Sequence, residues 1–364
     1  MTVQTITAST VVTPLGVLEP GQLSIDNGTI VDVRASRGTA PERILCPGFV
    51  DLQVNGHDDV HVALAEGADW ERLDQLLLSQ GVTGWCPTLT TAPLAGYSSP
   101  LERIASARTR PGIHPAILGA HLEGPFLGGA TGAHRKEHVL SLDRAWLHDL
   151  PAVVRVVTLA PELDEAPEAV ADLTARNIVV ALGHSHASFE DATSAANAGA
   201  SLVTHVFNAM SPMHHRAPGL AGAALSDPRL TPSVIADGVH VHPAVLRLVA
   251  HAKGRGNWAV VTDAVGWRDE RIHLRTSPRD GAPRLADGTI AGSATTMDAA
   301  VGYLVQTARI GLTDAVHAAS TTPARVLGVD DDRGALAPGL RADLVTLDPN
   351  TLRATATWIA GEPA

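Results

Sequence analysis

Short apolar runs alternate with amphipathic stretches through the middle of the chain. Runs of this kind, bounded by polar groups, are typical of strands that are buried on both faces of a parallel sheet. Helix-like stretches such as 70–80, 164–176, 189–198 and 243–253 separate most of them, and this alternation favours a closed parallel barrel. The eight predicted strands are residues 49–54, 82–89, 116–122, 153–159, 178–182, 202–206, 233–236 and 258–261.

Both ends of the chain have a different pattern, with short strands broken by turns. Near the N-terminus, Asn27-Gly28 lies between two apolar segments, which is a strong signal for a β-hairpin. Near the C-terminus, residues 341–348 and 354–359 are strand-like as well. We therefore predict an α/β protein in two domains. They are a (β/α)8 TIM barrel, residues 47–333, and a small β-sandwich domain formed by both chain termini, residues 1–46 and 334–364.

Length and composition agree with this architecture. A chain of 364 residues suits a full barrel with a small accessory domain. Hydrophobic residues make up 45% of the chain and aromatic residues only 3%, so the core must consist mostly of Ala, Val, Leu and Ile. The formal net charge of -11 argues against binding to nucleic acid, which needs a basic surface. A few local cations could still hold one phosphate group.

The cysteine content and the absence of targeting signals suggest a cytoplasmic protein. Cys46 and Cys86 form neither a disulfide framework nor a CxxC metal site. The first residues lack the basic start and apolar block of a signal peptide. The chain has no apolar run of about 18 residues, so we expect no membrane span.

Several predicted strands end in polar groups at the edge where TIM-barrel enzymes carry their active sites. Glu123, His184 and His205 each end a different strand. One carboxylate and two imidazoles suit Zn²⁺, and a fourth position left open for water suits catalysis. Each residue alone has an ordinary explanation, such as a surface histidine or a carboxylate that caps a turn. The prediction of a metal site therefore depends on the combination.

Asp263 ends the last predicted strand. A carboxylate beside a metal site can take a proton from water and later deliver it to a leaving amine. The alternative is that Asp263 caps the following helix.

The motifs resemble those of the amidohydrolase superfamily, and within it the N-acetylglucosamine-6-phosphate deacetylases. The segments HLEGP and THxxNAM are quite specific to that deacetylase group. The matching segments run in family order over almost the whole chain: 47–56 (PGFVDLQVNG), 121–126 (HLEGPF), 183–185 (GHS), 204–210 (THVFNAM), 218–222 (PGLAG), 235–241 (IADGVHV), 261–264 (VTDA) and 292–297 (GSATTM).

The resemblance implies an enzyme of amino-sugar catabolism. It would hydrolyse the acetamide of N-acetyl-D-glucosamine 6-phosphate to D-glucosamine 6-phosphate and acetate. The resemblance implies Asp263 as the general base and acid, and His134 as the group that polarises the acetamide carbonyl. The implied metal ligands are Glu123, His184 and His205, and Gln53 could reach the ion through a water molecule.

The resemblance also implies a substrate site and a homodimer, in which the neighbouring subunit can contribute to the phosphate site. The implied substrate-binding residues are Asn208, Ala209, Arg216 and His240, and His215 could join them because it adjoins Arg216.

Two positions depart from the common patterns. Many amidohydrolases have His-x-His after the first strand, where Gln53 and Asn55 stand here. We therefore expect one divalent ion, which could be Zn²⁺, Fe²⁺, Co²⁺ or Mn²⁺. In addition, Ala217 replaces the glutamate of the usual Arg-Glu-Pro-Gly segment, which leaves the partner of Arg216 open.

Three alternatives remain at this stage. The first is the same reaction on another phosphorylated amino sugar, such as N-acetylgalactosamine 6-phosphate. The second is a different amidohydrolase, of the dihydroorotase or N-acyl-amino-acid hydrolase type. Such enzymes usually have His-x-His and a bridging lysine, and neither stands at the expected strand ends. The third is a non-catalytic barrel that binds sugar phosphates, against which Asp263 argues because binding alone needs no proton acceptor.

Overall fold

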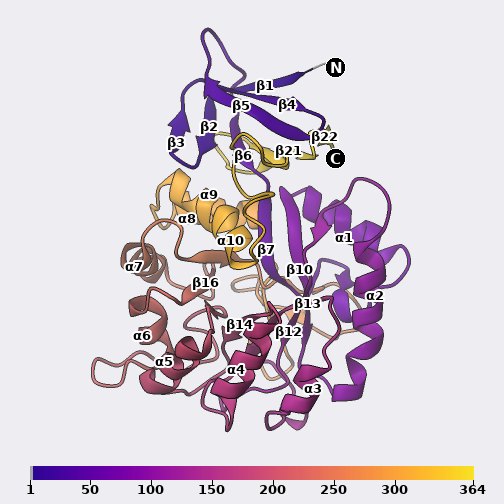
Figure 1. The fold of residues 1–364 in the computed structure, drawn as a ribbon, viewed down its shortest axis with the longest axis vertical. Helices are drawn as coiled ribbons and strands as arrows, with labels where there is room; N and C mark the ends of the chain where they lie inside the picture. The colour runs from indigo at the N-terminus through magenta and orange to yellow at the C-terminus, as the bar shows by residue number, and fades with distance from the viewer. Residues whose placement is uncertain (1–2) are drawn as a thin grey trace.

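Eight parallel strands form the central barrel of the computed structural model, which describes residues 3–364 (Figure 1). After the last strand, a parallel bridge between Val54 and Ala264 and a 3.0 Å hydrogen bond from the Asp263 N–H to the Gln53 carbonyl close the ring. The predicted TIM barrel is therefore confirmed. Its strands are β7 (Phe49–Val54), β10 (Val82–Thr90), β12 (Ala120–Glu123), β13 (Val154–Leu159), β14 (Val179–Leu182), β15 (Leu202–Val203), β16 (Thr231–Ile235) and β17 (Ala259–Val261).

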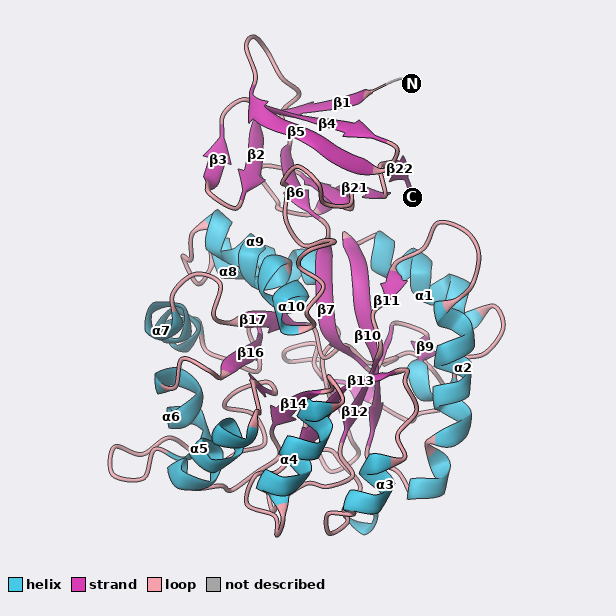
Figure 2. Cartoon of the chain, viewed as in Figure 1, coloured by secondary structure: helices cyan, strands magenta, loops and turns pink. Residues whose placement is uncertain are grey.

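Helices cover the outside of the barrel (Figure 2). Local signals fix their ends: Ser188 and Asp191 form a capping box at the start of α5, and Gly199, with a φ of 116°, ends it. None of the helices within residues 3–364 has the length and apolar character that a membrane crossing requires. The helices are α1 (Asp69–Leu78), α2 (Ser98–Arg108), α3 (Arg144–His148), α4 (Ala166–Ala175), α5 (Phe189–Ala198), α6 (Gly219–Ser226), α7 (Pro243–Lys253), α8 (Met297–Gln306), α9 (Leu312–Ala319) and α10 (Thr321–Val326).

The third predicted strand is divided in two, so the continuous strand 116–122 is wrong. β11 (Ala116–Ile117) pairs with the beginning of β10, and β12 pairs with its end. Gly119 lies between them with a φ of 142°, and a Cβ atom there would lie 2.4 Å from the Cβ of Arg155. The backbone conformation at Gly119, which favours glycine, therefore interrupts the strand.

Short elements surround the end of the barrel at which the strands finish. Two hairpins, β8–β9 and β18–β19, follow β7 and β17. Their bounds, with those of the three 3₁₀ turns, are β8 (Gly56–His57), β9 (Val60–His61), β18 (Arg275–Thr276), β19 (Pro283–Arg284), η1 (Val62–Leu64), η2 (Leu94–Gly96) and η3 (Lys136–His138).

The two chain termini together form a pair of packed sheets above the barrel in Figure 1. Side chains from both sheets, among them Leu23, Leu45 and Trp358, make one apolar cluster, so the predicted sandwich is confirmed. The Asn27-Gly28 turn joins two of its strands as predicted, with positive φ at both residues. One sheet contains β1 (Gln4–Ala8), β4 (Gly21–Asp26) and β5 (Thr29–Ala35); the other contains β22 (Glu362–Pro363), β21 (Ala354–Ile359), β20 (Leu344–Leu347), β6 (Ile44–Pro47), β2 (Thr10–Thr13) and β3 (Gly16–Leu18).

The terminal sheets and the barrel share apolar packing. Cys46 and Leu347 belong to the same buried cluster as Phe49 and Trp85 of the barrel strands. Cys46 and Cys86 are both buried and unpaired. The division of the chain after residues 46 and 333 stays a prediction, because this common core ties the two parts together.

Asp51 joins the first strand of the barrel to the last. Its Oδ2 accepts a 2.5 Å hydrogen bond from the Thr262 hydroxyl, and its Oδ1 accepts bonds from the N–H groups of Gln53 and Thr262. The carboxyl group is completely buried, and this burial raises the pKa of Asp51 to about 7.

This raised pKa predicts a stability that depends on pH. The folded chain holds the proton of Asp51 up to about pH 7, whereas an unfolded aspartic acid loses it near 3.8. The folded state therefore binds more protons in this window, and the contribution of Asp51 to stability is lost as the pH rises through it. In Asp51→Asn the side chain cannot titrate, so we expect urea unfolding to show the wild type losing stability relative to the variant between about pH 4 and pH 8. A difference in unfolding free energy that stays constant over this range would contradict the assignment.

Candidate active site

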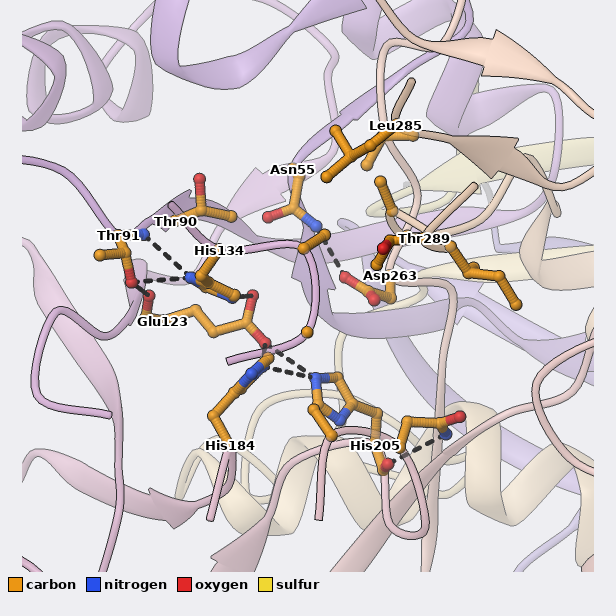
Figure 3. A pocket seen from close by; sticks show the side chains of 18 of the residues that line it. Asn55, Thr90, Thr91, Glu123, His134, His184, His205, Asp263, Leu285 and Thr289 are labelled. Atoms are coloured by element: carbon orange, nitrogen blue, oxygen red, sulfur yellow. Dashed lines mark hydrogen bonds and ion pairs between the residues drawn. The ribbon is translucent and has the colours of Figure 1, made fainter. Parts of the chain in front are cut away.

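A cavity of about 450 Å³ opens at the end of the barrel where the strands finish. Figure 3 shows His134 on one side of it and Asp263 with Leu285 on the other. The segment between β17 and α8 supplies an apolar wall of the cavity, formed by Ile272, Leu274, Leu285 and Ile290. The polar residues that line it include Asn55, Thr91, Glu123, His134, Arg135, His184, His205, Asn208, His240 and Asp263.

Three donor atoms converge in this cavity. Oε1 of Glu123 lies 3.1 Å from Nε2 of His184 and 3.0 Å from Nε2 of His205, and the two Nε2 atoms are 3.1 Å apart (Figure 3). Glu123 is the last residue of β12, and His184 and His205 follow β14 and β15; each of the three is at most 4% exposed. The three residues predicted as metal ligands are thus brought together.

The chemistry of these donors fits a divalent cation. Burial alone would raise the pKa of Glu123, but hydrogen bonds from His134, His184 and His205 hold it well below its usual range. Burial lowers the pKa of His184 to about 4, so its ring is neutral at physiological pH. The pKa of His205 is raised, because the charge and hydrogen bond of Glu123 outweigh burial. A cation bound here would compete with a proton for the His205 nitrogen.

His134 is a second candidate partner for the same carboxylate. The donor atoms of Glu123, His134 and His184 lie within 4.8 Å of one another, so they too could hold a metal ion. However, Nε2 of His134 lies 3.6 Å from Oε2 of Glu123, farther than either of the other rings is from Oε1.

Thr91 fixes the orientation of the His134 ring. The Thr91 hydroxyl lies 2.7 Å from Nδ1, and the Thr91 N–H donates to the same nitrogen at 3.3 Å. Because a backbone N–H can only donate, Nδ1 acts as an acceptor, and the proton of the neutral ring is on Nε2. His134 therefore directs an N–H group towards Glu123 and the interior of the cavity.

Two amides hold the carboxylate of Asp263. Its Oδ1 accepts hydrogen bonds from Nδ2 of Asn55 at 2.7 Å and from Nε2 of Gln53 at 3.0 Å. The same Gln53 nitrogen also donates to Oε1 of Glu123 at 2.8 Å, so one amide joins the two carboxylates. Burial, followed by the negative charge of Glu123, raises the pKa of Asp263 to about 6.

Left-handed backbone turns present several of these side chains. His184, His205 and Asp263 have φ angles of 51°, 30° and 48°, and Ala209 has a φ of 47°. Each such residue costs about 1–3 kcal/mol, and conformations of this kind cluster at functional sites. His184, His205 and Asp263 each lie two residues beyond the end of a strand, so the left-handed conformation turns the chain there.

A layer of polar residues supports the site from within the barrel. Burial lowers the pKa of His121 to about 4, and its Nδ1 donates to the Leu52 carbonyl. Its Nε2 lies 2.7 Å from the Thr158 hydroxyl, which in turn meets the Thr204 hydroxyl at 2.8 Å. These contacts tie β7, β12 and β13 to the residue that precedes His205.

Sequence reasoning missed two supporting residues, Thr91 and Glu162. The Glu162 carboxylate accepts from the Ser185 hydroxyl at 2.6 Å and from the His186 N–H at 2.8 Å, which holds the turn after His184. Their position just beyond β10 and β13 is the only sequence signal that could have indicated them.

The residues expected to bind substrate are only partly brought together. Asn208, Ala209 and His240 line the cavity. Nδ1 of His240 lies 2.7 Å from Oδ2 of Asp237, which orients the ring. Arg216 and His215 instead lie on an exposed loop, where Nη1 of Arg216 is 2.8 Å from Nε2 of His215, and neither lines the cavity.

A TIM barrel with such a cluster of carboxylate and imidazole donors is typical of metal-dependent hydrolases. Comparisons with known proteins place the chain in the same class. The Amidohydrolase family matches residues 44–363, and the chain belongs to this family. Among curated relatives, the chain is 38% identical to N-acetylgalactosamine-6-phosphate deacetylase of Escherichia coli O157:H7 over 98% of both chains. It is equally 38% identical to N-acetylglucosamine-6-phosphate deacetylase of Homo sapiens, covering 95% of this chain and 88% of that one.

Solved structures give the same picture. A mutant N-acetyl-D-glucosamine-6-phosphate deacetylase from Mycobacterium smegmatis, in complex with N-acetyl-D-glucosamine-6-phosphate, matches with a TM-score of 0.91 and 33% identity over 100% of this chain and 99% of that one. The N-acetylglucosamine-6-phosphate deacetylase from Thermotoga maritima matches with a TM-score of 0.89 and 30% identity over 99% of each chain.

Proposed function

We propose that the protein hydrolyses the acetamide of N-acetyl-D-glucosamine 6-phosphate to D-glucosamine 6-phosphate and acetate. The observation that carries this proposal is the buried carboxylate of Asp263, held by Gln53 beside the convergent donors on Glu123, His184 and His205. The full-length similarity to deacetylases of phosphorylated amino sugars supports this substrate class.

Glu123, His184 and His205 would hold one divalent ion, for which zinc is our first choice because one carboxylate and two imidazoles suit it. Iron, cobalt and manganese are chemically acceptable in the same site. When bound, such an ion acts as a Lewis acid and makes water a nucleophile at neutral pH. Gln53 already donates to Glu123, so its contact with the ion would pass through a water molecule.

Asp263 would move the proton. Both amides donate to Oδ1, which leaves Oδ2 to accept a proton from the attacking water. The same carboxyl group would then protonate the amide nitrogen as the carbon–nitrogen bond breaks. A pKa of about 6 allows both transfers near neutral pH.

His134 would stabilise the charge that develops on the acetamide oxygen. Thr91 holds its Nδ1 as an acceptor, so its Nε2–H faces the cavity without any rearrangement. A donor of this kind, aimed at the position of the developing oxyanion, is typically worth about 3–4 kcal/mol.

The sugar phosphate would lie against Asn208, Ala209 and His240, with Arg216 and His215 as further contacts. Because Arg216 and His215 lie outside the cavity lining, their contribution fits a neighbouring subunit better than their own chain. We keep the homodimer and the cytoplasmic location as predictions.

A second substrate, N-acetylgalactosamine 6-phosphate, deserves a parallel test because a relative named for it is 38% identical over 98% of the chain. Acetate release from both phosphorylated epimers and from free N-acetylglucosamine, measured with the zinc-loaded protein, separates the candidates. We expect the highest kcat/KM for N-acetyl-D-glucosamine 6-phosphate. A higher kcat/KM for the galactose epimer would show that N-acetylgalactosamine 6-phosphate is the preferred substrate. If none of the three compounds released acetate, the proposed deacetylase activity would be contradicted.

The metal assignment predicts different behaviour for two histidine variants. After dialysis, elemental analysis should find about one divalent ion per chain in the wild type and in His134→Ala, because three ligands suffice for tight binding. His205→Ala should hold clearly less. The reverse order would make His134 a ligand, and two tightly held ions per active chain would contradict a single-ion site.

Asp263→Asn keeps the shape of the side chain but cannot accept a proton. We expect kcat to fall by about 10²–10⁴-fold or more with little change in KM, because the proton transfer matters only in the transition state. In the wild type, activity should fall as the pH drops through the pKa of the carboxyl group. Asp331→Asn, at an exposed position beyond α10, is the matched control and should retain wild-type turnover. An Asp263→Asn protein that holds its metal and works within about tenfold of wild type would remove Asp263 from this role.

A further inference from the structure

Arg135 is the only lysine or arginine that lines the cavity in the described part of the chain. It directly follows His134, and its side chain is exposed just before η3. Other arginines around the barrel are paired, such as Arg110 with Asp74 at 2.9 Å. Within residues 3–364, by contrast, the Arg135 guanidinium makes neither an ion pair nor a side-chain hydrogen bond. A cation without a carboxylate partner therefore stands at the mouth of the cavity.

The loop that carries Arg135 lies against the turn proposed to hold the sugar phosphate. A Cβ atom on Gly132 would lie 3.4 Å from the Cβ of Ala209 and 3.6 Å from Cε1 of His184. Three peptide units join Gly132 to Arg135, so their Cα atoms are at most about 11 Å apart. A long, flexible arginine side chain can span much of that distance, which brings the space above Ala209 within reach of its guanidinium.

The charge of the cavity residues favours such a cation for an anionic substrate. The interior contains the carboxylates of Glu123 and Asp263, and the whole chain has a formal net charge of -11. These carboxylates repel a phosphate monoester, and a guanidinium close to the phosphate would offset that repulsion. Arginine suits this task because its planar fork binds phosphate oxygens through two parallel hydrogen bonds.

We propose that Arg135 binds the phosphate group of the substrate from within the same chain. This inference rests on the proposed function and makes Arg135 the residue that distinguishes phosphorylated from free sugars. The shape of the substrate agrees with the arrangement. The acetamide on C2 and the phosphate on C6 project from opposite sides of the sugar ring, so a phosphate at the mouth directs the acetamide towards Asp263 and His134.

Kinetics with two substrates test the proposal. Arg135→Gln should raise KM for N-acetyl-D-glucosamine 6-phosphate by at least about ten- to a hundredfold, because the loss of only one of the two hydrogen bonds to a charged group already accounts for this range. The loss of kcat/KM on free N-acetylglucosamine should be at least about tenfold smaller. Lys136→Gln is the matched control, because it removes the same charge one residue farther along, outside the cavity lining. Arg135→Lys should recover part of the lost affinity, because it restores the charge but not the fork.

Two results would overturn the inference: an Arg135→Gln enzyme that keeps its preference for the phosphorylated sugar, or an equal loss on both substrates. Arg216→Gln, measured in parallel, shows whether that residue carries the preference instead. A failure of the proposed function is distinguishable, because the wild type itself would then release no acetate from either substrate.

Discussion

Closure of the barrel between β7 and β17 is the contact on which the geometry of the site depends. Asp51 accepts hydrogen bonds from Thr262 across this seam, and the Gln53 carbonyl accepts from the N–H of Asp263. The seam brings together residues that are about two hundred positions apart in the sequence, and it places the amide of Gln53 between the carboxylates of Asp263 and Glu123. A barrel that did not close here would leave the proposed base without a fixed distance from the metal donors.

The parallel direction of the strands supplies the rest of the arrangement. Because all eight strands finish at one rim, side chains at their ends face a common cavity, although no two of the proposed metal donors are neighbours in the chain. The cavity holds two buried carboxylates and several imidazoles with one apolar wall. Such an interior strengthens electrostatic interactions, which accounts for the opposite displacements of the pKa values of Glu123 and Asp263. One carboxylate stays ionised, and the other titrates close to the range in which a proton acceptor and donor is effective.

Periodicity in the sequence could predict the barrel because its strands are apolar runs and its helices have clear ends. Residues 189–198 were predicted as a helix and form α5, since Ser188 and Gly199 mark its ends unambiguously. The break at Gly119 could not be predicted, because it depends on close packing against Arg155 from a strand that follows later in the chain.

Motifs indicated the proposed metal ligands, but contacts that depend on loop conformation could not be predicted from the sequence. Thr91 orients His134 through a hydrogen bond across 43 residues, and nothing near Thr91 in the chain signals this role. In the same way, the sequence could not show that Arg135 lines the cavity and that Arg216 does not, because both are exposed loop arginines.

The central claim is that three strand ends hold one ion, and anomalous diffraction from crystals of the zinc-loaded protein tests it most directly. The account predicts one peak per chain, about 2.0–2.2 Å from a Glu123 carboxylate oxygen and from Nε2 of His184 and His205. In this result, His134 and Asp263 would lie beyond bonding distance of the ion. A peak bound by His134 in place of His205, or a second fully occupied peak in the cavity, would contradict it.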